Sequence, residues 1–231
     1  MFSIAANSST MSTKKKAATK APSPMAALLG PKLVKGKNTV DTDTALGSKP
    51  LVALYFSASW CPPCKSFSPV LKEFYNATSD DMEVVYVSSD RSVQEFDAYF
   101  AEMPWLAIPI TPGSAQIKQN LSDQLKVTSI PTMVILETAT GHFISNNGRG
   151  QVQQTRADPS SFAKLIQVWK DTQALPFSEA NMGSAAGGVI QTILGTVLRN
   201  PAFLIALVYG YKYLRRWYRE KYGGDAIEPE L

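Results

Sequence analysis

The chain has 231 residues, of which 45% are hydrophobic and 18% charged, and its net charge at pH 7 is +4. About 150 residues are enough for one independent core. The positive charge comes largely from the two ends, so it indicates targeting and anionic lipid rather than nucleic acid, for which the sequence contains no motif. A phosphate-binding glycine loop is not apparent in the sequence either.

The first 24 residues differ in composition from those that follow. They are rich in Ser, Thr, Ala and Lys, and no acidic residue occurs before Asp41. Transit segments are Ser-rich and poor in acid, but this stretch has no arginine, and Phe2 to Ala6 is too short for a secretory apolar core. Residues 1–24 are therefore either a targeting segment or a disordered basic tail, and we place the folded domain at residues 25–175.

A Trp-Cys-Pro-Pro-Cys motif lies between a strand pattern and a helix pattern. Residues 51–56 form an apolar run of the length expected for a buried central strand, and residues 65–75 carry apolar side chains at helical spacing. The two prolines of the motif lack N–H groups, which costs nothing in a first helical turn. We therefore expect Cys61 at or near the N-cap of a helix and Cys64 in its first turn.

The helix start favours a thiolate. The helix dipole and the free backbone N–H groups stabilise a negative sulfur there. Cysteines of helix-start CxxC motifs can have a pKa near ~7 against ~8.5 for a free thiol, which corresponds to about 2 kcal/mol in favour of thiolate. Because the first cysteine lies at the helix end and the second lies one turn deeper, we assign attack to Cys61 and resolution to Cys64.

Two other uses of the cysteines compete with redox chemistry. Structural zinc needs four ligands, and the only other soft candidate in the sequence is His142, so we expect no metal site. A purely structural disulfide would close a very short loop and, in the loop-entropy model, would stabilise the fold only slightly. A CxxC pair between a strand and a helix favours a reversible dithiol over both.

The residues around the motif, 55–65, resemble the active-site stretch of the tryparedoxin and nucleoredoxin branch of the thioredoxin superfamily. Residues 28–34 resemble the opening of tryparedoxins. Three further segments match the family in its order: 84–90, 103–109 and 129–132. The resemblance covers about residues 25–172, and it implies an α/β class of fold, the thioredoxin fold, in which a central mixed β-sheet is flanked by helices.

The resemblance also implies roles for the residues around the dithiol. The Ile130–Pro131 bond is expected to be cis, with the backbone of Ile130 presented to an extended substrate and Pro131 shaping the groove. Trp60 and Trp105 are placed at the mouth of the site. The residues assigned to the groove are Trp60, Pro62, Pro63, Trp105, Ile130 and Pro131, beside the redox disulfide of Cys61 and Cys64.

One position departs from the wider superfamily. Thioredoxins place a buried acid on the strand six residues before the first cysteine, and this chain has Tyr55 there, as tryparedoxins do. The substitution supports the branch assignment. It leaves the proton acceptor for Cys64 open, with water or a nearby acid as candidates.

The rest of the domain predicts a parallel or mixed sheet covered on both faces, because strand and helix patterns alternate. Residues 92–95 have the form of a capping box for a helix that carries Val93, Phe96 and Phe100 inward. Further expected elements are strands at 132–137 and 142–145 and a last helix that starts at Asp158 and Pro159 and buries Phe162, Leu165, Ile166 and Trp169.

The C-terminal part has a small-residue linker at 176–188 and then an apolar and amphipathic helical segment at 189–219. Residues 187–211 would extend about 37 Å as a helix, against roughly 30 Å of hydrocarbon in a bilayer. Insertion into the bilayer is marginal. The apolar side chains favour it by on the order of 5 kcal/mol, and Arg199 near the middle opposes it by about 3 kcal/mol. The Tyr, Trp, Lys and Arg residues that follow are typical of a membrane interface.

We therefore predict a membrane anchor at 189–219, followed by a polar tail at 220–231. An amphipathic helix lying in the membrane plane and a soluble docked helix are the alternatives. The pattern resembles the tail anchors of mitochondrial outer-membrane proteins, and the endoplasmic reticulum is another candidate membrane. The redox domain would then face the cytosol.

Together these features predict a membrane-tethered thiol–disulfide oxidoreductase of the protein disulfide reductase kind. Its partners would be disulfide-containing proteins and an external electron donor, either a thiol or a reductase, with no bound cofactor. A non-catalytic redox-sensing or scaffold module with the same fold is the alternative. An oxidant or isomerase of a secretory compartment is a third, for which no secretory signal is apparent.

Overall fold

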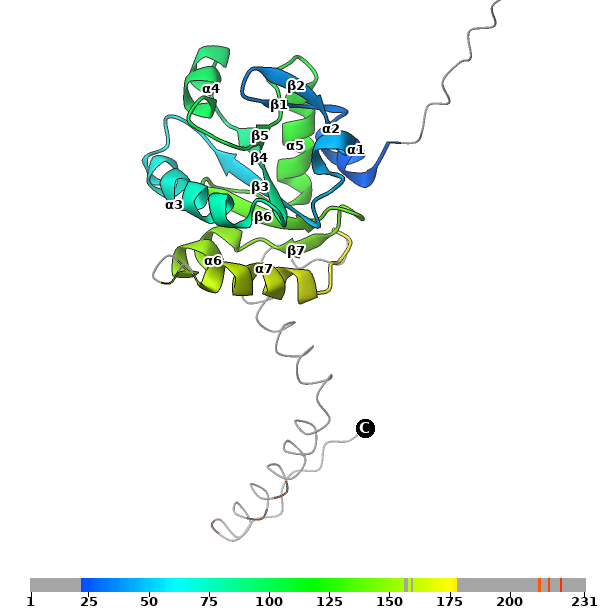
Figure 1. Cartoon of the computed structure of the whole chain (residues 1–231), viewed down its shortest axis with the longest axis vertical. Coiled ribbons are helices and arrows are strands. Elements are labelled where there is room, and N and C mark those ends of the chain that lie inside the picture. Colours follow the sequence, from blue (N-terminus) through cyan, green and yellow to red (C-terminus); the bar gives the residue numbers. More distant parts are fainter. Residues whose placement is uncertain are drawn as a thin grey trace, which may run out of the picture.

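The computed structural model describes residues 22–155, 158, 160–177, 212, 216 and 221. Within them the chain forms one mixed sheet between two groups of helices (Figure 1). The strands are β1 (Lys32–Lys35), β2 (Asn38–Asp41), β3 (Leu51–Ser57), β4 (Met82–Ser88), β5 (Leu106–Ala107), β6 (Thr132–Glu137) and β7 (Phe143–Ser145). The helices are α1 (Pro24–Leu29), α2 (Thr42–Leu46), α3 (Pro62–Thr78), α4 (Val93–Phe100), α5 (Ser114–Gln124), α6 (Gly148–Thr155) and α7 (Ser161–Asp171).

The sheet has the strand order β2-β1-β5-β4-β3-β6-β7. The central strands β3, β4 and β5 are parallel, whereas β6 and β7 on one side and β1 and β2 on the other are antiparallel. Every residue of β3 and β4 is buried, because helices cover both faces of the sheet. The expected thioredoxin fold with a mixed sheet is thus confirmed.

The first face is covered by α3, α4, α6 and α7, with α6 and α7 lying side by side in Figure 1. Leu51, Ala53 and Tyr55 of β3 point toward this face, as the period of two in a strand requires. The ring of Phe74 from α3 contacts two aromatic rings of α7 edge to face, with centroid distances of 5.1 and 5.8 Å. These contacts fix α3, and with it the motif at its start, against α7.

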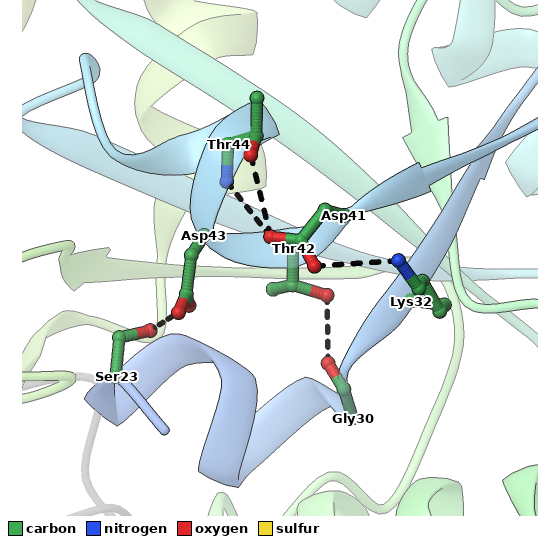
Figure 2. Close-up of polar contacts among 7 residues, drawn as sticks. All are labelled: Ser23, Gly30, Lys32, Asp41, Thr42, Asp43 and Thr44. Carbon is green, nitrogen blue, oxygen red and sulfur yellow. Dashed lines mark hydrogen bonds and ion pairs between the residues drawn. The ribbon is translucent and has the colours of Figure 1, made fainter. Parts of the chain in front are cut away.

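The opposite face is covered by α1, α2 and α5, against which Val52, Leu54 and Phe56 of β3 pack. Polar contacts join α1 and α2 to the β1–β2 hairpin, as Figure 2 shows. Thr42 Oγ1 donates to the carbonyl of Gly30 at 2.7 Å, and Asp41 both accepts from the backbone N–H of Thr44 and pairs with Lys32. These elements are short, and no periodic pattern in the sequence predicted them.

Helix α4 begins where the capping box predicted, although the box is only half formed. The Ser92 side chain accepts from the Glu95 backbone N–H at 3.1 Å, while the Glu95 carboxylate accepts from Arg91 N–H instead of Ser92 N–H. The prediction that Val93 points inward is wrong, since its side chain is 47% exposed. The buried face is formed by Phe96, Tyr99 and Phe100, whose spacing of three and four residues places them on one side of the helix.

The last helix buries the four residues predicted from its pattern, Phe162, Leu165, Ile166 and Trp169. Its predicted start at Asp158 is too early, because α7 begins at Ser161. Asp158 instead accepts a hydrogen bond from the backbone N–H of Ser160 at 3.0 Å and forms a turn before the helix. Side-chain acceptors of this kind compete with the helical hydrogen-bond pattern.

The predicted membrane segment at 189–219 lies outside the described residues, except for Lys212 and Arg216. Residues 1–21 and most of the polar tail lie outside them as well. In the described ranges, no helix combines the length and the apolar character needed to cross a bilayer.

Candidate active site

The dithiol lies at the junction between β3 and α3. Cys61 is the N-cap residue of α3, and its sulfur accepts a hydrogen bond from the backbone N–H of Cys64 at 3.3 Å. Pro62 and Pro63 occupy the first turn, where a missing N–H leaves no intrahelical bond unmade. The predicted cap position is confirmed. The start of α3 therefore directs its partial positive charge at the Cys61 sulfur.

Cys61 and Cys64 are joined by a disulfide bond, with their Cα atoms 5.2 Å apart. Cys61 is 5% exposed, whereas Cys64 is fully buried beneath it. Of the two cysteines, only Cys61 therefore keeps any exposure to solvent. This difference in access is the geometry that the assigned roles of attacking and resolving sulfur require.

The loop before β6 closes the site from the other side. Its Ile130–Pro131 peptide bond is cis, as the resemblance implied. The antiparallel pairing of β3 with β6 sets Thr132 opposite Phe56 and so brings this loop to the strand end that precedes the dithiol. The Cys61 sulfur lies 3.9 Å from the carbonyl oxygen of Ile130, whose half-buried side chain packs against the cluster of Ala58, Cys61 and Cys64.

The two tryptophans assigned to the mouth of the site have different environments. Trp60 is 45% exposed next to Cys61, its indole N–H donates to the Ser89 carbonyl at 3.1 Å, and the Arg91 guanidinium lies 5.2 Å from its ring centroid. Trp105 does not lie at the mouth. Only 1% of it is exposed, and it packs edge to face against Tyr55 and another buried tyrosine. It directly precedes β5, whose pairing with β4 brings it into the core.

Asp90 connects the site to the neighbouring strand, and no role was predicted for it from the sequence. One carboxylate oxygen accepts from the Ser59 backbone N–H at 2.6 Å, and the other accepts from the hydroxyls of Tyr86 and Ser88 at 2.6 and 2.7 Å. The carboxyl ends of parallel strands meet at one edge of a sheet, so an acid just after β4 is within reach of the loop after β3. That position is the signal from which Asp90 could have been found.

The electrostatics of Asp90 follow from these bonds. Burial alone would raise the pKa of its carboxyl group, but the hydrogen bonds from Tyr86, Ser59 and Ser88 outweigh burial and hold the pKa below its ordinary value. Asp90 is therefore ionised at neutral pH, and its charge is engaged by three donors. Through its bond to the Ser59 N–H, Asp90 holds in place the loop that carries Trp60.

A hydroxyl network lies beneath the dithiol, where thioredoxins have the buried acid. The Tyr55 hydroxyl donates to the Cys64 carbonyl at 3.3 Å, and Ser68 Oγ, which is bonded to the Tyr99 hydroxyl, donates to the same carbonyl at 3.1 Å. Burial raises the pKa of Tyr55, so it stays protonated at neutral pH. In the part of the chain that the structure describes, no carboxylate is hydrogen-bonded to Cys64.

His142 lies just before β7, away from the dithiol, where its backbone N–H donates to the Thr140 hydroxyl at 3.1 Å. Among the described residues, no group of three or more His, Cys, Asp and Glu side chains is placed to hold a metal ion.

Comparison with known proteins places this site in a family. A family model described as thioredoxin-like matches residues 49–142. The chain is 43% identical to the tryparedoxin of Trypanosoma brucei brucei over 103 residues, which are 44% of this chain and 70% of that protein. It is also 37% identical to the nucleoredoxin of Danio rerio over 164 residues, which are 69% of this chain. The match spans 37% of the length of that relative.

Solved structures agree with the sequence comparison. Tryparedoxin II from Crithidia fasciculata superposes with a TM-score of 0.54 at 34% identity, covering 60% of this chain and 90% of that one. A CxxC disulfide at a helix start, opposed by a cis-proline loop, defines the class as thioredoxin-like. Within that class, the chain belongs to the thioredoxin-like oxidoreductases of the tryparedoxin and nucleoredoxin type.

Replacement of Asp90 by Asn should weaken the pH dependence of stability. Because the pKa of Asp90 is lowered by folding, its carboxylate stabilises the fold above the pKa of an unfolded aspartic acid, ~3.9, and this contribution is lost as the pH falls through the lower folded pKa. Urea titrations of the full chain between about pH 6 and pH 3 should show a larger loss of unfolding free energy for the wild type than for Asp90→Asn. Asp97→Asn, an exposed change on α4, should behave as the wild type. Equal pH dependence in the wild type and Asp90→Asn would contradict this assignment.

Proposed function

We propose that the chain is a protein disulfide reductase that cycles Cys61 and Cys64 between dithiol and disulfide. One observation supports this most strongly: the two cysteines are bonded at a helix start, where Cys61 keeps 5% of its surface exposed and Cys64 is fully buried. A structural disulfide has no need of that difference in access. The homologues of the tryparedoxin and nucleoredoxin type are thiol–disulfide oxidoreductases.

In the reaction, the Cys61 thiolate attacks one sulfur of a substrate disulfide. The other substrate sulfur leaves as a thiolate, and Cys61 is left in a mixed disulfide with the substrate. Cys64 passes its proton to the thiolate that left in the first step, then attacks the Cys61 sulfur and releases the second substrate thiolate. Two electrons have passed from the dithiol to the substrate, and the Cys61–Cys64 bond has formed.

The start of α3 lowers the free energy of the attacking anion. In the oxidised form the Cys64 N–H already points at the Cys61 sulfur at 3.3 Å. The same donor, together with the helix dipole, stabilises a thiolate at that position. Cys64 is fully buried, so it acts only after the substrate is bound to Cys61.

The substrate segment lies, in this proposal, along the backbone of Ile130. The carbonyl of Ile130 is beside the Cys61 sulfur, so an extended chain that presents its disulfide there can hydrogen-bond to the same loop. Pro131 shapes this groove. Trp60, Pro62 and Pro63 are exposed around Cys61 and provide rigid apolar surface for the substrate. Trp105 is removed from the set because it is buried.

The oxidised dithiol is returned to its reduced form by an external donor, a thiol or a reductase. One tryparedoxin II structure is a complex with glutathionylspermidine, which supports a thiol as donor in this family. No bound cofactor enters the proposed cycle.

Variants of the two cysteines test this proposal. Cys61→Ser should lose insulin disulfide reduction entirely, because the attacking sulfur is gone. Cys64→Ser should accumulate mixed disulfides with substrate proteins, because the resolving sulfur is gone. Turbidity of reduced insulin and mass spectrometry of trapped partners measure the two results. Wild-type rates for Cys61→Ser, or no covalent partner for Cys64→Ser in intact cells, would refute the assigned roles.

We further propose that residues 189–219 anchor the chain in a membrane, with the redox domain in the cytosol. The support comes from the sequence: an apolar segment of nearly spanning length, followed by aromatic and basic residues typical of an interface. The mitochondrial outer membrane and the endoplasmic reticulum are the two candidate membranes.

Extraction of cell membranes with alkaline carbonate tests the anchor. The full chain should stay in the membrane pellet, and a chain ending at residue 177 should be released. Leu204→Arg should also be released. Insertion of the unmodified segment is already marginal, and a further arginine near its middle costs about 3 kcal/mol. Release of the unmodified full chain would contradict a spanning anchor and favour a helix lying in the membrane plane.

A further inference from the structure

An exposed patch beside the dithiol is formed by Trp60, Arg91 and Val93, and the cycle described above uses only the first of these residues. Trp60 directly precedes Cys61, and Val93 is the first residue of α4. Ser92, between Arg91 and Val93, is extended (φ −143°, ψ 160°), a conformation that points the side chains on either side of it in the same direction. Trp60 and Val93 are 45% and 47% exposed. We call these three residues the Trp60 patch.

The guanidinium of Arg91 is held in place within this patch. It lies 5.2 Å from the centroid of the Trp60 ring, and the ring is fixed by the bond of its indole N–H to the Ser89 carbonyl at 3.1 Å. The backbone N–H of Arg91 donates to the Glu95 carboxylate at 2.9 Å. A guanidinium stacked on an aromatic ring keeps the N–H groups at its edge available to an acceptor. Because it is already positioned, it loses less entropy when an acceptor binds.

The acids of the domain do not occupy this cation. Within residues 22–155, the Arg91 guanidinium forms no ion pair. The Glu95 carboxylate bonds the backbone of Arg91 instead of its side chain. The Asp90 carboxylate accepts three hydrogen bonds and attracts the half-buried Lys118 of α5. Because Arg91 is exposed, its side-chain donors are open to a carboxylate from another molecule.

We infer that the Trp60 patch selects protein substrates that carry an acidic residue close to the reactive disulfide, with the carboxylate bound by Arg91. This inference rests on the proposed reductase function and names the class of its substrates. A guanidinium binds a carboxylate through two parallel N–H···O bonds, which adds geometric specificity to the attraction of charge. The apolar surface of Trp60 and Val93 favours a polypeptide, whose side chains contact both the cation and its surroundings, over a small inorganic anion.

The position of the acid in the substrate follows from the order of the residues at the site. The substrate cysteine bonds Cys61, Trp60 is the next residue, and Arg91 lies against the ring of Trp60. We place the acid within about four residues of the substrate cysteine, which is a reach of about 13 Å for an extended chain. The contact is separate from the backbone of Ile130, which lies on the other side of the dithiol.

The test compares three disulfide peptides as substrates of the reduced full chain. The peptides share one sequence and carry two Glu, two Gln or two Lys residues at matched positions within four residues on each side of the cysteine. Second-order rate constants are measured at about 10 mM ionic strength by alkylation of Cys61 and Cys64 and mass spectrometry. Each is divided by the rate of the same peptide with dithiothreitol, which removes the intrinsic reactivity of its disulfide. The wild type should reduce the Glu peptide about threefold faster than the Gln peptide, as expected for one exposed charge pair, and the Lys peptide more slowly.

Variants of Arg91 change this order in a defined way. Arg91→Gln should abolish the preference for the Glu peptide, and Arg91→Glu should favour the Lys peptide. Arg91→Lys keeps the positive charge and should keep the order of the three peptides. Lys37→Gln, which removes one exposed charge at the β1–β2 turn, should retain the wild-type ratio. Raising the ionic strength to about 0.5 M should reduce the preference of the wild type, because exposed charges are screened.

Each result is a ratio of two peptides on one protein, so a change in the folded fraction of a variant cancels. Equal normalised rates for the Glu and Gln peptides with the wild type, or a Glu preference that persists in Arg91→Gln, would overturn the inference. If the wild type reduces all three peptides equally, the reductase function stands and only this inference fails. If it reduces none of them with Cys61 and Cys64 in the dithiol form, the reductase function itself fails, and the inference fails with it.

Discussion

The arrangement of the site depends on one hydrogen bond, from the backbone N–H of Cys64 to the sulfur of Cys61 at the start of α3. It places the first sulfur at the positive end of a helix of 17 residues and leaves the second fully buried beneath it. The aromatic contacts of Phe74 hold the body of that helix against α7, which covers the same face of the sheet. The fold thus fixes a position at which a sulfur anion is favoured, and the proposed chemistry uses that position.

Two loops from neighbouring strands complete the site, and each depends on the sheet. The loop before β6 brings Ile130 to the Cys61 sulfur because β6 pairs with β3. The loop after β4 holds the backbone of Ser59 through the carboxylate of Asp90, because β4 is parallel to β3. Both loops therefore border the dithiol at the start of α3.

The sequence predicted the features whose signals are local. The CPPC spacing and the apolar periods gave the cap position of Cys61, the central strand and the four buried residues of the last helix. The family resemblance gave the cis bond before Pro131. Two aspects depended on packing between distant segments and were not predictable in this way. The burial of Trp105 follows from the pairing of β5 with β4, and the role of Asp90 follows from the adjacency of two parallel strands.

The central claim is that Cys61 is held as a reactive anion at the start of α3. It is tested most directly by the rate at which iodoacetamide alkylates Cys61 of the reduced chain as the pH is varied. The account predicts that Cys61 is modified before Cys64, with a half-maximal rate near pH ~7, against ~8.5 for free cysteine. A profile that coincides with free cysteine, or modification of Cys64 first, would contradict it.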